Sequence, residues 1–171
     1  MMHMMIDTET WGLAANSAIR SVGLVFFDPY AEPGKVGTRY YCATIDETGT
    51  KDEKTEKWWS EQSEEARSVF VNPVDIGVVL SDIHILYRGT CEKVWAHGSV
   101  FDIPLLENAF ARHGLEAPWN YKDVRDTRTI YELAGETIVS LPGYETKHHA
   151  LHDAYNQAVA VQRSYRKLFA K

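Results

Sequence analysis

The chain has 171 residues, 44% hydrophobic and 25% charged, which fits a single globular domain spanning residues 1–171. Its formal net charge of -6 argues against general electrostatic attraction to nucleic acid or to anionic membranes. No apolar run approaches the roughly 20 residues of a membrane span, and no secretory signal is evident. A cytoplasmic protein is therefore expected, with Cys42 and Cys91 as buried free thiols.

The first predicted element is a strand that begins with the apolar run Met4–Ile6 and carries two carboxylates, Asp7 and Glu9. Side chains alternate along a strand, so both carboxylates point to the same face. Two like charges this close repel unless a cation lies between them, and hard oxygen ligands suit Mg²⁺ or Mn²⁺. For such a pair alone, the commoner alternative is a solvated strand end that turns at Gly12.

Two further strands are predicted in the first third of the chain. Ala18–Phe27 is rich in β-branched and aromatic residues and ends at an Asp-Pro turn. Thr38–Ile45 follows a Pro-Gly turn. With the opening strand, these two segments are expected to form a three-stranded antiparallel meander.

The middle of the chain is predicted to be helical. The charged segment Asp46–Lys57 is expected to be a surface loop, and a helix follows over Trp58–Arg67, with Ser63 as a cap that divides it in two. A second helix is predicted over Val74–Arg88 and ends at Gly89. The apolar face of this second helix is expected to include Val74, Val78 and Ile85.

The C-terminal half alternates strands and helices. A central strand at Lys93–His97 is expected to lead into an amphipathic helix over Asp102–His113. A short strand at Lys122–Arg125 precedes a helix over Asp126–Ala134, and a last helix spans His149–Phe169. The order predicts an α/β fold with a mixed sheet, three antiparallel strands followed by parallel strands, flanked by helices. This arrangement resembles a ribonuclease-H-like core.

Two more aspartates lie near the starts of predicted helices. Asp102 follows the central strand. The alternative to a role in a site is that its carboxylate is an ordinary helix cap. Asp153 lies near the start of the last helix, and three histidines are found among the six residues that end with it. A histidine cluster on a surface is usually incidental. The loop histidine His148, however, can lean over a metal that Asp153 holds.

Metal-assisted hydrolysis of a phosphodiester requires this set of side chains. Carboxylates hold two cations roughly 3.5–4 Å apart, one to activate water and one to stabilise the leaving oxygen. A neutral histidine, with an ordinary pKa of about 6.5, can accept the proton of the water. Since Mg²⁺ and Mn²⁺ prefer oxygen ligands, the role of general base is favoured for His148 over the role of metal ligand. The carboxylates of such a site add to the negative net charge of the chain. A bound metal would reverse the sign of the charge at the site.

Three motifs occur in order between residues 7 and 153 and together carry a family resemblance. They are the Asp-x-Glu pair Asp7-Thr8-Glu9, a His-x-x-x-Phe-Asp run that ends at Asp102, and a His-x-Ala-x-x-Asp run from His148 to Asp153. With these motifs the chain resembles the DEDDh, or DnaQ-like, 3′–5′ exonucleases. With the adjacent Trp58 and Trp59, the chain is similar to a compact branch of this family that contains bacterial exoribonucleases and phage-type exonucleases.

The resemblance implies a catalytic centre with two divalent ions, Mg²⁺ or Mn²⁺, and His148 as general base. His149 is a competing base, because a tyrosine occupies that nearer position in the sister subfamily; Ala150 favours His148. Glu9 is expected to serve catalysis as well as metal binding. The implied metal ligands are Asp7, Glu9, Asp102 and Asp153.

The resemblance also implies contacts with the terminal nucleotide. They come from Thr10, Leu13, His97 and Phe101, with Leu13 wedged against the base; simple core packing is the alternative for Leu13 and Phe101. Of the adjacent tryptophans, one is expected in the core and the other near the substrate cleft.

The sequence therefore predicts a metal-dependent 3′–5′ exonuclease that hydrolyses single-stranded nucleic acid to nucleoside 5′-monophosphates. The resemblance that the tryptophan pair carries implies a slight preference for RNA over DNA. The alternatives are a ribonuclease-H-like endonuclease and a non-catalytic nucleic-acid-binding relic of the fold. The expected partner is the 3′ end of a single strand and not a membrane, and a homodimer is left open.

Overall fold

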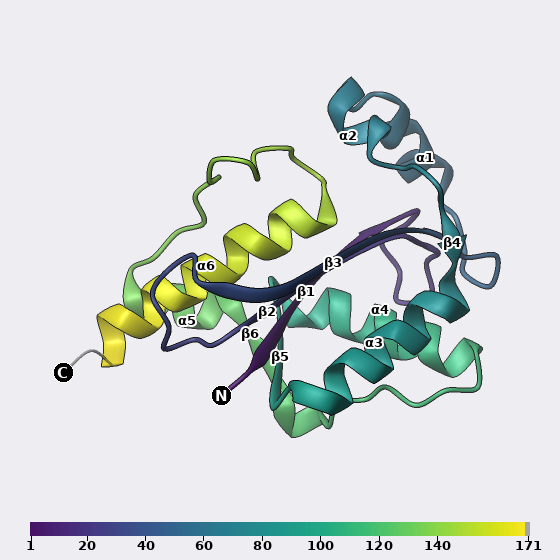
Figure 1. The fold of residues 1–171 in the computed structure, drawn as a ribbon. Coiled ribbons are helices and arrows are strands. Elements are labelled where there is room, and N and C mark those ends of the chain that lie inside the picture. The colour runs from purple at the N-terminus through teal and green to yellow at the C-terminus, as the bar shows by residue number, and fades with distance from the viewer. Residues whose placement is uncertain (170–171) are drawn as a thin grey trace.

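The computed structural model describes residues 1–169, within which six strands form one mixed sheet in the order β4-β3-β2-β1-β5-β6 (Figure 1). The strands are β1 (His3–Thr10), β2 (Ile19–Phe27), β3 (Val36–Ile45), β4 (Val74–Asp75), β5 (Lys93–Ala96) and β6 (Val124–Asp126). β1, β2 and β3 pair antiparallel, and β4, β5 and β6 each pair parallel to a neighbour. The predicted α/β fold with a ribonuclease-H-like mixed sheet is confirmed.

Helices cover both faces of this sheet, with α6 along one face and α3 and α4 along the other (Figure 1). The helices are α1 (Glu53–Ser60), α2 (Glu64–Ser68), α3 (Ile76–Thr90), α4 (Ser99–Arg112), α5 (Thr127–Ala134) and α6 (Ala150–Phe169). A single 3₁₀ turn, Tyr121–Asp123, precedes β6. No helix within residues 1–169 combines the length and the apolar character needed to cross a membrane.

The strand β1 separates two hydrophobic cores. Met4 and Ile6 pack into the core beneath α3 and α4, whereas Met5 packs into the core beneath α5 and α6. All three side chains are completely buried. Asp7 and Glu9 continue the alternation that starts at Met5, so both carboxylates leave β1 on the face that α6 covers.

The predicted starts of two helices were wrong. Helix α1 begins at Glu53, inside the segment predicted as a loop, because Asp52 caps it by accepting a hydrogen bond from the backbone N–H of Lys54 at 3.2 Å. Helix α4 begins at Ser99, so Asp102 lies inside its first turn.

The predicted apolar face of the helix over Val74–Arg88 was also wrong. Val74 and Asp75 form the short strand β4 instead, and the helix starts at Ile76 and runs through Gly89 to Thr90. A different stripe of this helix faces the sheet. Val78 and Ile85 are 52% and 70% exposed, and the buried positions are Ile76, Val79, Leu80, Ile83 and Tyr87.

The two cysteines are free, as predicted, but neither is fully buried. Cys42 lies on β3, near the edge of the sheet, and Cys91 caps the C-terminal end of α3. Both positions are at the margin of a core, which explains their partial exposure.

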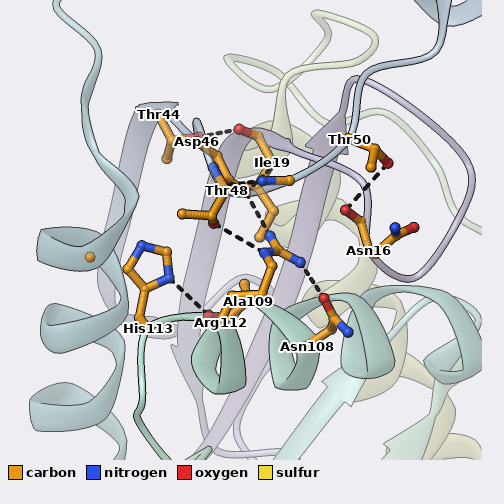
Figure 2. A network of polar contacts seen from close by, with 12 residues as sticks. Asn16, Ile19, Thr44, Asp46, Thr48, Thr50, Asn108, Ala109, Arg112 and His113 are labelled. Carbon is orange, nitrogen blue, oxygen red and sulfur yellow. Dashed lines mark hydrogen bonds and ion pairs between the residues drawn. The ribbon is translucent and has the colours of Figure 1, made fainter.

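A polar network ties the end of β3 to α4 (Figure 2). The side chain of Asp46 is completely buried and accepts a hydrogen bond from Nη2 of Arg112 at 2.9 Å. Its carboxylate oxygens also accept from the backbone N–H groups of Ile19, Thr48 and Gly49, at 3.0 to 3.1 Å. Arg112 is thus the cation that compensates a buried charge.

Replacing Arg112 by Ala is expected to destabilise the fold by about 2–4 kcal/mol, because the Asp46 charge would stay buried without its ion-pair partner. The free energy of urea unfolding measures this change. As a control, Arg166→Ala removes an exposed ion pair with Glu32, so a loss of no more than about 1 kcal/mol is expected there. Equal effects of the two changes would contradict the role of Arg112 as the partner of a buried charge.

Candidate active site

Three carboxylates converge where β1 meets the start of α6. Asp7 and Glu9 from β1 and Asp153 from the first turn of α6 each offer an oxygen, and these atoms lie within 4.8 Å of one another. Gln157, one helical turn beyond Asp153, donates a hydrogen bond from Nε2 to Oδ1 of Asp7 at 2.8 Å. The cluster is therefore held from both sides, by a strand and by a helix.

Gly23 allows α6 to approach the sheet this closely. The strand register pairs Gly23 with Asp7. A Cβ at Gly23 would lie 2.2 Å from the carbonyl carbon of Ala150, a separation that no real contact allows. Any side chain at this position would push the start of α6, and with it Asp153, away from β1.

The change Gly23→Ala is therefore expected to cost about 1–3 kcal/mol of stability from overpacking. It should also lower nuclease turnover by roughly 100-fold, because a catalytic group moved by about 1 Å costs that much. Urea unfolding and a nucleotide-release assay measure the two effects. Gly89→Ala is the matched control, since a Cβ there meets nothing within 4 Å; unchanged turnover in both variants would contradict the role of Gly23.

Asp102 is held beside this cluster by Thr8. It is 5% exposed, and its Oδ1 accepts hydrogen bonds from the backbone N–H of Thr8 at 3.0 Å and from its Oγ1 at 2.6 Å. It is not a member of the compact group of three oxygens. Its charge nevertheless raises the pKa of both Asp7 and Glu9.

Burial raises the pKa of all four carboxyl groups, and repulsion by neighbouring carboxylates adds to this effect at Asp7 and Glu9. Burial, followed by the charge of Asp153, raises the pKa of Glu9 to about 8. Burial and the charges of the other three raise the pKa of Asp7. Burial raises the pKa of Asp102 and that of Asp153 to about 6. Such a cluster of oxygen donors fits a hard divalent cation, which would remove the repulsion.

His148 lies on the loop that precedes α6, five residues before Asp153. Its ring makes edge contacts with Trp58 and Trp59, with ring centres 4.8 Å and 6.2 Å apart. Its φ of 58° is in the left-handed region, which a non-glycine residue rarely adopts and which is common at functional sites. Burial, and then Lys147, lowers the pKa of His148 below its ordinary value, so its imidazole is neutral at pH 7.

His149 has a different environment. Its ring stacks on His152 with centres 4.0 Å apart and lies 4.4 Å from the ring of Tyr41. Its Nδ1 is buried without a hydrogen-bond partner, and burial lowers its pKa to about 4. His149 is therefore part of an aromatic stack and does not share the tryptophan contacts of His148.

A pocket of about 430 Å³ adjoins the carboxylates at Glu9. Of the predicted nucleotide contacts, Thr10, Leu13 and Phe101 line it; the other lining residues are Thr8, Asp52, Lys54, Thr55, Trp58 and Trp59. Leu13 is 79% exposed, so core packing does not explain it. Trp59 is buried and Trp58 is 40% exposed, which matches the expected division between core and cleft.

His97 does not line this pocket. Its Nδ1 lies 2.8 Å from Oγ1 of Thr127, and its ring stacks on Tyr131 with centres 5.9 Å apart. Both partners belong to α5. The end of β5 therefore directs His97 toward α5.

A mixed sheet in this order, with carboxylates brought together on its central strand β1, is the arrangement of a ribonuclease-H-like fold. The chain belongs to the family described as the 3′–5′ exoribonuclease Rv2179c-like domain, whose model matches residues 2–165. The resemblance to the DEDDh 3′–5′ exonucleases is thereby confirmed. This family implies dependence on a divalent metal. No curated protein sequence is significantly similar to the chain.

Solved structures share the fold at low sequence identity. E. coli Exonuclease I in complex with a dA16 oligonucleotide has a TM-score of 0.72 at 14% identity, covering 98% of this chain and 41% of that one. A zinc-bound form of the E. coli ExoI–ssDNA complex has a TM-score of 0.69 at 16% identity, covering 96% and 40%. The nuclease domain of 3′hExo, a DEDDh family member bound to rAMP, has a TM-score of 0.65 at 13% identity, covering 94% and 90%. The chain spans about two fifths of the length of Exonuclease I.

Proposed function

We propose that this protein is a divalent-metal-dependent 3′–5′ exonuclease that releases nucleoside 5′-monophosphates from single-stranded RNA. The observation that carries the proposal is the convergence of Asp7, Glu9 and Asp153 within 4.8 Å. Asp102 lies beside them, tied to Thr8. Half-buried carboxylates that repel one another in this way are a costly arrangement unless a cation is bound.

The proposed ligands of two divalent ions are Asp7, Glu9, Asp102 and Asp153. When bound, such ions activate a water molecule and stabilise the leaving 3′ oxygen. His148 is the proposed general base, since a neutral imidazole on the adjacent loop can accept the proton of that water. Gln157 fixes the carboxylate of Asp7 through its 2.8 Å hydrogen bond.

The pocket beside Glu9 is the proposed site of the terminal nucleotide. Exposed Leu13 and Trp58 offer apolar surface, and Phe101 adds an aromatic ring to the lining. Stacking on such side chains requires a base that is free of a duplex partner and tolerates any sequence. The proposal therefore specifies a single strand and no base preference.

The choice of RNA over DNA rests on the description of the family as exoribonucleases. The rAMP-bound nuclease domain of 3′hExo adds support from a structural neighbour. Exonuclease I, another neighbour, is seen with DNA oligonucleotides, so the fold alone does not select the sugar.

Matched circular and linear single strands test the proposal against an endonuclease. Loss of the linear RNA with release of 5′-monophosphates, beside an intact circle, is the expected result. Cleavage of the circle would instead identify an endonuclease. Failure of both Mg²⁺ and Mn²⁺ to support release of mononucleotides would favour a non-catalytic relic. Sedimentation equilibrium of the same preparation tests for a homodimer.

A further inference from the structure

The pairing of β1 with β2 is irregular at the end next to the carboxylates. Glu9 pairs with Ser21 and Thr10 with Ile19, so Arg20 is an extra residue at a β-bulge. Ile19 and Val22 both pack into the core beneath α3 and α4, although regular alternation would place them on opposite faces. The bulge corrects this phase and turns Arg20 away from that core, to the face that carries Glu9.

Arg20 is buried in an unusual environment for a cation. It is 3% exposed, and its Nε and Nη1 are buried without a hydrogen-bond partner. Its Cζ lies 3.9 Å from the ring centre of Trp59, 5.0 Å from that of Phe70 and 5.4 Å from that of Trp11. A buried guanidinium without hydrogen bonds is costly, and the cation–π contacts offset part of this cost.

The strand that carries two of the carboxylates lies next to this guanidinium. Nε1 of Trp59, the ring that holds the guanidinium, donates a hydrogen bond to the carbonyl oxygen of Thr10 at 2.8 Å. Thr10 directly follows Glu9. Burial lowers the pKa of Arg20, and Tyr41 and then the charge of Glu9 oppose that effect. Arg20 is thus a neighbour of Glu9, because it is the extra residue opposite the Glu9–Thr10 step of β1 and its ring partner Trp59 is hydrogen-bonded to Thr10. No ion pair joins Arg20 and Glu9 among residues 1–169.

We propose that Arg20 is a positioning residue that supplies a fixed positive charge to the carboxylate cluster and moderates its affinity for divalent metal. In the metal-free protein, the charge offsets part of the repulsion among the carboxylates. In the metal-bound protein, the same charge repels the cation and so permits its release. This role rests on the proposed function, because it requires that the cluster binds metal.

Calorimetric titration of Mn²⁺ into the full chain tests the proposal without an activity assay. Arg20→Met keeps much of the side-chain volume but removes the charge, so Mn²⁺ should bind about 10-fold tighter. The rise in Tm between EDTA and saturating Mn²⁺ should also be larger than in wild type. Arg20→Lys keeps the charge, and its Kd should stay within about threefold of the wild-type Kd.

Phe70→Leu is the control for packing alone, since it removes one ring of the cage without changing a charge. A lower Tm with an unchanged Kd for Mn²⁺ is expected in this variant. A purely structural role of Arg20 would instead give Arg20→Met and Arg20→Lys the wild-type Kd, and that result would overturn the proposal. Absence of Mn²⁺ binding by the wild-type chain would overturn the proposed metal site itself.

Discussion

Replacing Glu9 by Gln is expected to lower the turnover of single-stranded RNA by roughly 10³-fold. The substitution keeps the shape of the side chain and removes one negative charge from the oxygen cluster. A metal ion contributes several kcal/mol of transition-state stabilisation, and each 1.36 kcal/mol corresponds to about a tenfold change in rate. Release of 5′-mononucleotides under saturating substrate measures the effect, with Glu116→Gln as an exposed control.

The same substitution should make the metal-free protein more stable, and the gain should grow with pH. The pKa of Glu9 is about 8 in the folded chain, well above the value of 4.5 expected when the chain is unfolded. Between these two values the folded state binds the proton that the unfolded state has lost, so stability falls as pH rises from about 4.5 to about 8. Glu9→Gln removes this loss.

Urea unfolding in EDTA at pH 5 and at pH 8 measures this pH dependence. The stability of Glu9→Gln relative to wild type should be greater at pH 8. Saturating Mn²⁺ should reduce or reverse the difference, because only the wild-type site has its full set of charges. A difference that does not change with pH would show that the repulsion at Glu9 is unimportant.

The second large effect is expected at His148. His148→Ala should lower turnover by about 10²–10⁴-fold, the usual contribution of a general base, whereas His149→Ala should lower it less than tenfold. His148 contacts Trp58 at the cleft, while His149 stacks on His152 with a buried Nδ1. An inactive His149→Ala protein beside an active His148→Ala protein would contradict the assignment.

The pH dependence of turnover gives a second measure of the same base. A general base must be neutral to act, and burial lowers the pKa of His148 below its ordinary value of 6.5. Turnover should therefore persist below pH 6.5 and fall only as the imidazole becomes protonated. The acidic limb of the profile should be missing from the residual activity of His148→Ala.

The fold was predictable from the sequence because its central strands have strong patterns. The apolar start of β1 and the β-branched, aromatic composition of Ile19–Phe27 identify strands, and both lie at the centre of the sheet. The prediction failed where short polar elements depend on single caps. Asp52 starts α1 within a charged segment that otherwise has the composition of a loop.

The residues that shape the candidate site were harder to find than the carboxylates. Gly23 lies inside a strand, a sign of close backbone approach, but only the structure shows that Ala150 fills the space. Gln157 follows Asp153 by four residues and so shares its helix face. Arg20 could not have been predicted, because its direction depends on a bulge in the pairing with β1.

Digestion of RNA and DNA oligonucleotides of one sequence, labelled at either end, tests the central claim most directly. With Mg²⁺ or Mn²⁺, the 5′-labelled RNA should shorten from its 3′ end in a ladder, and the 3′-labelled RNA should release its label first as a mononucleotide. The DNA should shorten more slowly, and EDTA or Glu9→Gln should abolish the ladder. A ladder that persists in EDTA, or internal cuts without mononucleotide release, would contradict a metal-dependent 3′–5′ exoribonuclease at this carboxylate cluster.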